Sequence, residues 1–131
     1  MNNVRLTLSI LSGEYGVCRL APDAAIPSWV PATGFVSITR TAEELSIVCE
    51  EIALPADVRS EPGFSMLKIE GPLDFSLTGI LMAAAGPLAD AEIPIFAIST
   101  FDTDYVLVPS ASLEKAVAAL EAAGHRIGGH R

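Results

Sequence analysis

The chain has 131 residues, half of them hydrophobic, and carries a formal net charge of −8 at pH 7. Its length allows one compact unit or two very small ones, and its hydrophobic content argues against a disordered chain. The acidic balance argues against nucleic acid and anionic membranes as partners, because basic patches bind both. We expect the longest basic cluster, which runs from His125 to Arg131, to be a solvated tail.

Targeting and metal-binding patterns are missing from the sequence. The apolar run at residues 6–11 is too short for a signal peptide, and no run approaches the ~18 residues of a membrane span. Cys18 and Cys49 have no CxxC or Cys/His spacing, which predicts two buried thiols. We therefore expect a cytoplasmic protein without a metal or a cofactor.

The first half of the chain is predicted to be rich in strands. Four segments with many Val, Leu and Ile residues favour strands, namely residues 4–11, 15–20, 35–39 and 45–50. Turn chemistry at residues 12–14 predicts a hairpin between the first two strands. Residues 54–63 contain two prolines and are expected to form a surface linker. We therefore divide the chain into domains at 1–60 and 61–131.

The second half has a different order of elements. Strands are expected at residues 64–70, 94–100, 105–108 and 125–127. Apolar spacing predicts a helix over 77–88, with a kink or a restart at Pro87, and a second helix capped by Ser110 and ended by Gly124. The order β-α-β-β-α-β predicts a ferredoxin-like plait of the α+β class, preceded by the smaller strand-rich half.

One candidate binding segment joins the first strand of the plait to its first helix. It consists of Gly71, Pro72, Leu73 and Asp74. Free backbone N–H groups at the start of a helix bind anions, and Gly71 allows a close approach to the backbone. An amino-acid carboxylate would fit there. The simpler interpretation is that Asp74 or Ser76 only caps the helix.

A second candidate segment is the turn between the middle strands of the plait. It comprises Ser99, Thr100, Phe101, Asp102 and Asp104. The two carboxylates can accept charge-assisted hydrogen bonds from an ammonium or a guanidinium group. The simpler interpretation is an Asp-rich turn whose side chains bond their own backbone. From the topology we expect the two segments to lie close together.

The motifs GPLDFSLTGIL and IPIFAISTFDTDYVLV resemble those of a small tandem ACT-domain family. The same family is similar to the paired regulatory ACT domains of aspartate kinases and to the arginine-sensing CASTOR proteins. The resemblance extends over residues 4–127 and is strongest from Phe64 onward. It implies a tandem ACT fold that binds a free amino acid, or a similar small metabolite, at the two segments above. Ser12, Gly13 and Glu14 are further candidates from the first half.

Three functions compete on this sequence. The leading hypothesis is an allosteric sensor that binds an amino acid, catalyses nothing itself and acts through a homodimer or a protein partner. The alternative is an assembly module without a ligand. It is favoured by the strand at residues 95–98, which is apolar on both faces, so that the first half of the chain or a second chain is expected to cover the outer face. The third is a small enzyme that uses Asp102 and Asp104 for acid–base chemistry, although no common catalytic motif is present.

Overall fold

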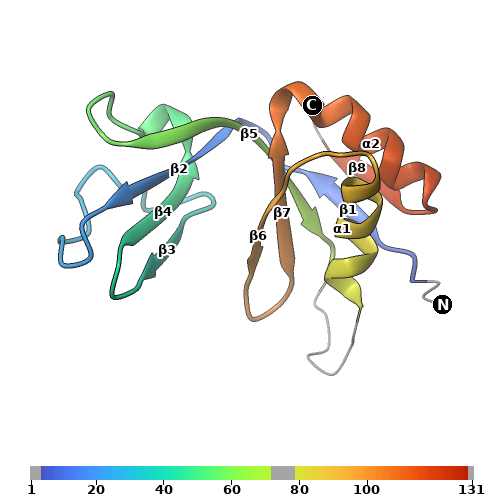
Figure 1. Ribbon diagram of the computed structural model, residues 1–131, viewed down its shortest axis with the longest axis horizontal. Helices are drawn as coiled ribbons and strands as arrows, with labels where there is room; N and C mark the ends of the chain where they lie inside the picture. Colours follow the sequence, from blue (N-terminus) through green and yellow to red (C-terminus); the bar gives the residue numbers. More distant parts are fainter. Residues whose placement is uncertain (1–3, 72–78, 130–131) are drawn as a thin grey trace. The chain divides into compact units, whose positions relative to one another are not determined.

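The structure is a computed structural model that describes residues 4–71 and 79–129. The chain forms two compact units (Figure 1). Unit 1 consists of Met1–Ser12 and Ser65–Arg131, and unit 2 consists of Gly13–Phe64. Unit 2 is therefore inserted between two segments of unit 1. The division into domains at residue 60 remains a proposal.

Unit 1 is built from a mixed sheet and two helices. In spatial order its strands are β8 (Arg126–Gly129), β1 (Thr7–Ile10), β5 (Ser60–Ile69), β7 (Asp104–Pro109) and β6 (Phe96–Ser99). Helices α1 (Ile80–Asp90) and α2 (Leu113–Ala122) contact each other (Figure 1). The chain order β5-α1-β6-β7-α2-β8 is the predicted ferredoxin-like order, so the fold class is confirmed.

Strand β1 lies between the first and the last strand of the plait. Leu8 is paired antiparallel with Ile69 of β5 and parallel with Ile127 of β8. Apolar side chains alternate along this strand, and those at positions 6, 8 and 10 are buried. The first predicted strand of the chain is therefore an internal strand of the unit 1 sheet.

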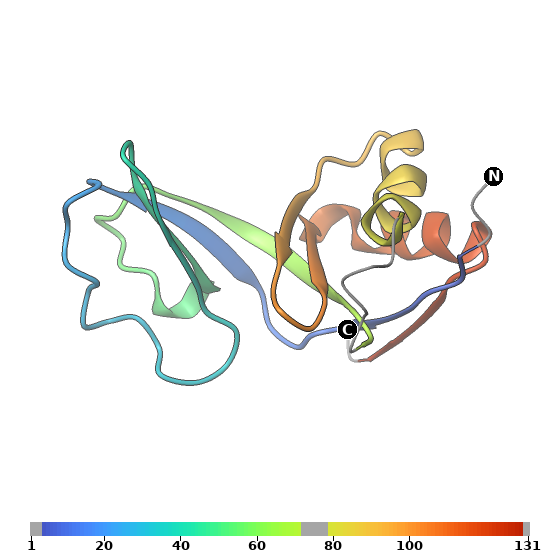
Figure 2. The ribbon, with the colours of Figure 1, turned by 90° about the horizontal axis from the view of Figure 1, so that it is seen from below.

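The hairpin predicted between the first two strands is wrong. Strand β1 pairs with residues 67–69 of β5, whereas β2 (Tyr15–Leu20) pairs with residues 60–64 of the same strand. Figure 2 shows β5 as one long strand, whose two parts belong to unit 2 and unit 1. Residues 12–14 do follow the end of β1, as their turn chemistry indicates. The partner of each strand, however, is selected by the packing of apolar side chains that are far apart in the sequence.

The core of unit 1 is made by its sheet and both helices. Every second residue of the strands points toward it, and one face of each helix closes it. The buried members of this core are Leu6, Leu8, Ile10, Leu67, Ile69, Ala84, Leu88, Ile93, Val106, Val108, Ala116, Val117 and Leu120.

Helix α1 runs through Pro87 as one element, without the restart that was considered. Because proline has no N–H, the carbonyl of Ala83 loses the donor that an α-helix normally supplies. Nε2 of His125 lies 2.7 Å from that carbonyl oxygen. Nδ1 of the same ring accepts the N–H of Leu6 at 3.0 Å, so Nε2 carries the proton and donates to Ala83.

The expectation of a solvated basic tail is wrong for His125, which is buried. Gly124 has a φ of 98° and ends α2 in the left-handed conformation, as predicted. The N–H of His125 then bonds to the carbonyl of Leu120, which directs the next residues back toward the sheet. The ring is thereby held against α1 and the start of β1.

The predicted cap of the second helix is also wrong. A short 3-10 turn, η2 (Ser110–Ser112), precedes α2, whose N-cap is Ser112. The Ser110 hydroxyl instead forms a hydrogen bond with the Ser65 hydroxyl at 2.9 Å. That bond gives the buried hydroxyl of Ser65 in β5 a partner. Ser110 therefore stabilises the sheet and does not cap the helix.

Unit 2 is an antiparallel sheet. Its strands follow the order β3 (Ser37–Arg40), β4 (Leu45–Glu50), β2 and the first part of β5, with a 3-10 turn, η1 (Glu51–Ala53), after β4. The buried part of its core contains Cys18 and Cys49 beside Leu45 and Ile47, so the prediction of buried thiols is confirmed. The expected linker ends too late, because residues 60–63 already belong to β5.

Candidate functional site

The first candidate segment begins where β5 ends. Gly71 is exposed and follows Glu70 directly. The other three predicted residues, Pro72, Leu73 and Asp74, lie outside the described residues. The N–H of Glu70 bonds to the carbonyl of Thr7, so β1 continues to hold β5 up to this point.

The second candidate segment is the turn between β6 and β7. The N–H of Thr100 donates to the carbonyl of Thr103 at 2.8 Å, and the Thr100 hydroxyl donates to the same oxygen at 3.1 Å. The N–H of Thr103 returns a bond to the Thr100 hydroxyl at 3.4 Å. These reciprocal bonds close the turn around Phe101 and Asp102.

Thr103 also connects this turn to the first segment. Its side chain is buried, and its hydroxyl donates a hydrogen bond to the carbonyl oxygen of Ile69. Ile69 stands two residues before Gly71, so the turn and the end of β5 lie side by side within unit 1. The sequence analysis listed Thr100 and Asp102 as candidate site residues but not Thr103, because nothing near Thr103 in the sequence indicates that its side chain is buried.

The predicted side chains of this turn differ in how firmly they are held. The Ser99 hydroxyl donates to Oδ1 of Asp104 at 2.5 Å, across the last pair of the β6–β7 ladder. Asp102 is exposed. The ring of Phe101 is 80 % exposed, which is unusual for a large aromatic side chain. Asp104 is therefore an oriented acceptor, whereas Asp102 and Phe101 stand at the surface.

Glu70 adds a third carboxylate at this end of the sheet. Its Oε2 accepts a hydrogen bond from the Ser9 hydroxyl at 2.5 Å. The sequence analysis missed both residues, although a polar side chain at the last position of a strand is a weak signal for a site. Glu70 is therefore a further oriented acceptor at the end of β5, on the face of the sheet that carries Ser9.

The residues at 12–14 were expected as contributors from the first half. Gly13 has a φ of 90°, a conformation that favours glycine. The carbonyl of Glu14 accepts the N–H of Glu51, which ties this loop to η1 inside unit 2. Ser12 is exposed and is the last residue of the first segment of unit 1. Their part in ligand binding remains a proposal.

Two kinds of feature are not seen in the described part of the chain. Over residues 4–71 and 79–129, no three His, Cys, Asp or Glu side chains gather as metal ligands. No helix in those ranges is long and apolar enough to cross a membrane.

Two family profiles match the chain. The profile of the ACT domain matches residues 59–122, and that of an N-terminal domain matches residues 13–57. The chain is 35 % identical over 89 residues to the human cytosolic arginine sensor for mTORC1, subunit 1. The match covers 67 % of this chain but only 26 % of that sensor.

Solved structures agree with the fold. The crystal structure of a protein from Agobacterium tumefaciens has a TM-score of 0.92 and 48 % identity, covering 98 % of this chain and 96 % of that one. The regulatory subunit of aspartate kinase from Thermus thermophilus has a TM-score of 0.63 over 89 % of this chain and 97 % of its own. Its identity of 14 % supports the fold alone.

Proposed function

Because this chain belongs to the ACT-domain family, we propose that it is a regulatory module that binds a free amino acid and catalyses no reaction of its own. The ligand lies at the end of β5 and the β6–β7 turn. The observation that carries this proposal is the Thr103–Ile69 hydrogen bond, which holds the two segments together. Thermal denaturation with candidate ligands tests it.

The two ends of an amino acid find different partners at this place. The backbone around Gly71, together with Pro72, Leu73 and Asp74, takes the carboxylate, since exposed backbone N–H groups bind anions. Asp104 accepts from the amino group or from a basic side chain, because the Ser99 hydroxyl holds its carboxylate in one orientation. Ser99, Thr100, Phe101 and Asp102 complete the surface.

Arginine is the first ligand to test. The related human protein is a cytosolic arginine sensor, and the chain matches 26 % of its length. The carboxylate of Asp104 and that of the exposed Asp102 lie in the same turn and favour a cationic side chain. We propose a cytoplasmic location, in keeping with that cytosolic relative. We also propose a homodimer or a protein partner as the route of the signal.

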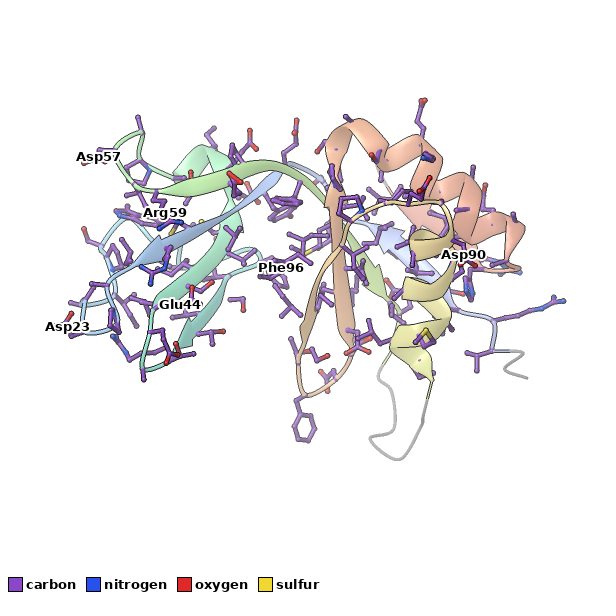
Figure 3. All side chains as sticks on the ribbon, in the orientation of Figure 1. Asp23, Glu44, Asp57, Arg59, Asp90 and Phe96 are labelled. Carbon is purple, nitrogen blue, oxygen red and sulfur yellow. The ribbon has the colours of Figure 1, made fainter. Side chains whose placement is uncertain are left out.

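The test is a melting experiment with each of the twenty amino acids at millimolar concentration. A ligand present at 100 times its Kd stabilises the folded state by about 2.7 kcal/mol, which raises Tm by several degrees in a protein of this size. Asp74→Ala and Asp104→Asn should abolish the shift. Asp90→Asn, at the exposed C-terminal end of α1 (Figure 3), is the matched control and should retain it.

One observation favours the alternative, an assembly module without a ligand. Among the described strands, β6 pairs only with β7, so one edge of this strand has no partner strand in the sheet. Ile95, just before it, is 37 % exposed. An edge of this kind can add a strand from another chain. A stable oligomer whose Tm is insensitive to all twenty amino acids would support this function and contradict the sensor.

A further inference from the structure

The peptide group that joins Ile69 to Glu70, at the end of β5, is hydrogen-bonded at both of its ends. The carbonyl oxygen of Ile69 accepts the hydroxyl of Thr103 from the β6–β7 turn. The N–H of Glu70 donates to the carbonyl of Thr7, in β1, at 2.8 Å. Because β5 lies between β1 and β7 in the sheet, the end of the strand is held from both sides.

A third bond reaches Glu70 through its side chain. The Ser9 hydroxyl of β1 donates to Oε2 of Glu70 at 2.5 Å. Ser9 is paired with Lys68, two residues before Glu70, so these three side chains lie on the face of the sheet opposite to the core. Strand β1 therefore holds Glu70 both by its backbone and by its side chain.

The bond from Ser9 acts where the strand stops. Strand β5 ends at Ile69, so Glu70 is the first residue beyond it. Chain ends and segments with few contacts open at a low free-energy cost, and a bond to an ionised acceptor is stronger than one between neutral groups. The Ser9 hydroxyl therefore keeps Glu70 in place at the position where the strand could fray.

The order at Glu70 matters because Gly71 follows directly, and the proposed amino-acid site begins there. Glycine loses more backbone freedom on ordering than any other residue. When the residue before it is already fixed in the free protein, less of this ordering has to accompany ligand binding, and the affinity is higher.

We propose that Ser9 is a positioning residue of the amino-acid site. By holding Glu70 it fixes the start of the site at Gly71 before a ligand arrives, and it does not touch the ligand itself. Glu70 takes part through its acceptor oxygen and not through its charge. This inference rests on the proposed function, since only a site that binds a ligand gains affinity from such order.

The test combines calorimetric titration of L-arginine with amide hydrogen exchange of the ligand-free protein. Ser9→Ala should weaken arginine binding about three- to tenfold and speed the exchange of the Glu70 amide about threefold or more. Ser9→Thr keeps the hydroxyl and should restore both values. Ser46→Ala, at an equally half-buried serine on β4, is the matched control and should change neither.

Two variants of Glu70 separate positioning from direct contact with arginine. The side-chain oxygen of Glu70→Gln can still accept the Ser9 hydroxyl, so most of the affinity should remain. Glu70→Ala should lose as much affinity as Ser9→Ala. An equal loss in Glu70→Gln and Glu70→Ala would show that the charge itself binds arginine, and the positioning role would be overturned.

Failure of this inference differs from failure of the proposed function. If the unsubstituted protein binds arginine and Ser9→Ala binds it equally well, the sensor stands and the role of Ser9 is wrong. If the unsubstituted protein responds to none of the twenty amino acids, the sensor fails and the positioning role fails with it. An unchanged exchange rate of the Glu70 amide in Ser9→Ala would overturn the positioning role even where arginine binds.

Discussion

The imidazole of His125 donates from Nε2 to the carbonyl oxygen of Ala83, the oxygen that Pro87 deprives of its helical donor. The imidazole ring thereby supplies the hydrogen-bond donor that Pro87 cannot provide in α1. Its Nδ1 also holds the N–H of Leu6 at the start of β1. A single buried side chain therefore joins α1, β1 and the chain that follows α2.

Replacing His125 by Ala should lower the free energy of unfolding by about 2–3 kcal/mol, because the partly buried carbonyl of Ala83 and the buried N–H of Leu6 each lose their partner. Urea denaturation followed by circular dichroism measures the change. The exposed Arg126→Ala, one residue further on, serves as the control and should cost much less.

The role of Pro87 can be separated from that of the ring. In Pro87→Ala the restored N–H can donate to the Ala83 carbonyl, so His125→Ala should cost about 1 kcal/mol less in this background than in the original one. The double-mutant cycle in urea gives this coupling energy. Strict additivity of the two substitutions would contradict the proposed relation between Pro87 and His125.

Thr103→Val removes the hydroxyl that bonds to Ile69 while keeping the side-chain shape. It should lower the free energy of unfolding by about 1 kcal/mol and reduce the ligand-dependent rise in Tm, because the turn no longer stays against the end of β5. Thr39→Val, exposed on β3, is the control. A full ligand response in Thr103→Val would show that the turn is not positioned by this bond.

Leu8→Ala tests whether β1 is an internal strand. Leu8 is fully buried between β5 and β8, so its truncation should cost about 3–5 kcal/mol. Ile38→Ala, at a side chain that is 40 % exposed on β3, should cost far less. Comparable losses in the two variants, measured in urea, would be inconsistent with the described position of β1.

The two buried thiols should make the free energy of unfolding depend on pH in the alkaline range. Burial raises the pKa of Cys18 and Cys49 above the ordinary value of 9.0, so both stay protonated when the folded protein is taken past that pH. The unfolded chain releases these protons first, and the stabilisation present below about pH 9 is lost as the pH rises. In Cys18→Ala/Cys49→Ala, the free energy of unfolding should fall less steeply above that pH.

Thiol accessibility gives a second reading of the same prediction. A thiol-specific reagent at pH 8 should modify Cys18 and Cys49 slowly in the folded protein and fast in urea, since the protonated buried thiol is a poor nucleophile. Rapid modification of the folded protein would contradict the buried position of both side chains.

Local patterns were sufficient to predict most elements. Helical spacing located α1 and α2, and Gly124 marked the end of the second helix through its left-handed conformation. The ferredoxin-like order followed from these elements. Such features depend on neighbours within a few residues, and the sequence displays those directly.

Contacts between distant residues could not be predicted in this way. His125 looked like part of a tail because nothing near it in sequence reveals that Pro87 frees a carbonyl in another helix. Thr103 and Glu70 were missed for the same reason, since their partners Ile69 and Ser9 are selected by the fold. The partner of β1 depends likewise on packing over a long sequence distance.

The insertion of unit 2 also lengthens the connection between β1 and β5. The N–H of Leu11 bonds to the carbonyl of Met66, so the two strands that flank the insertion meet as the arms of a hairpin would. Residues 13–64 therefore act as its loop, and closing so long a loop slows strand pairing. Early collapse of the inserted unit would shorten this search. A chain in which a tight turn replaces residues 13–64 should then form the β1–β5 pair faster than the full chain does.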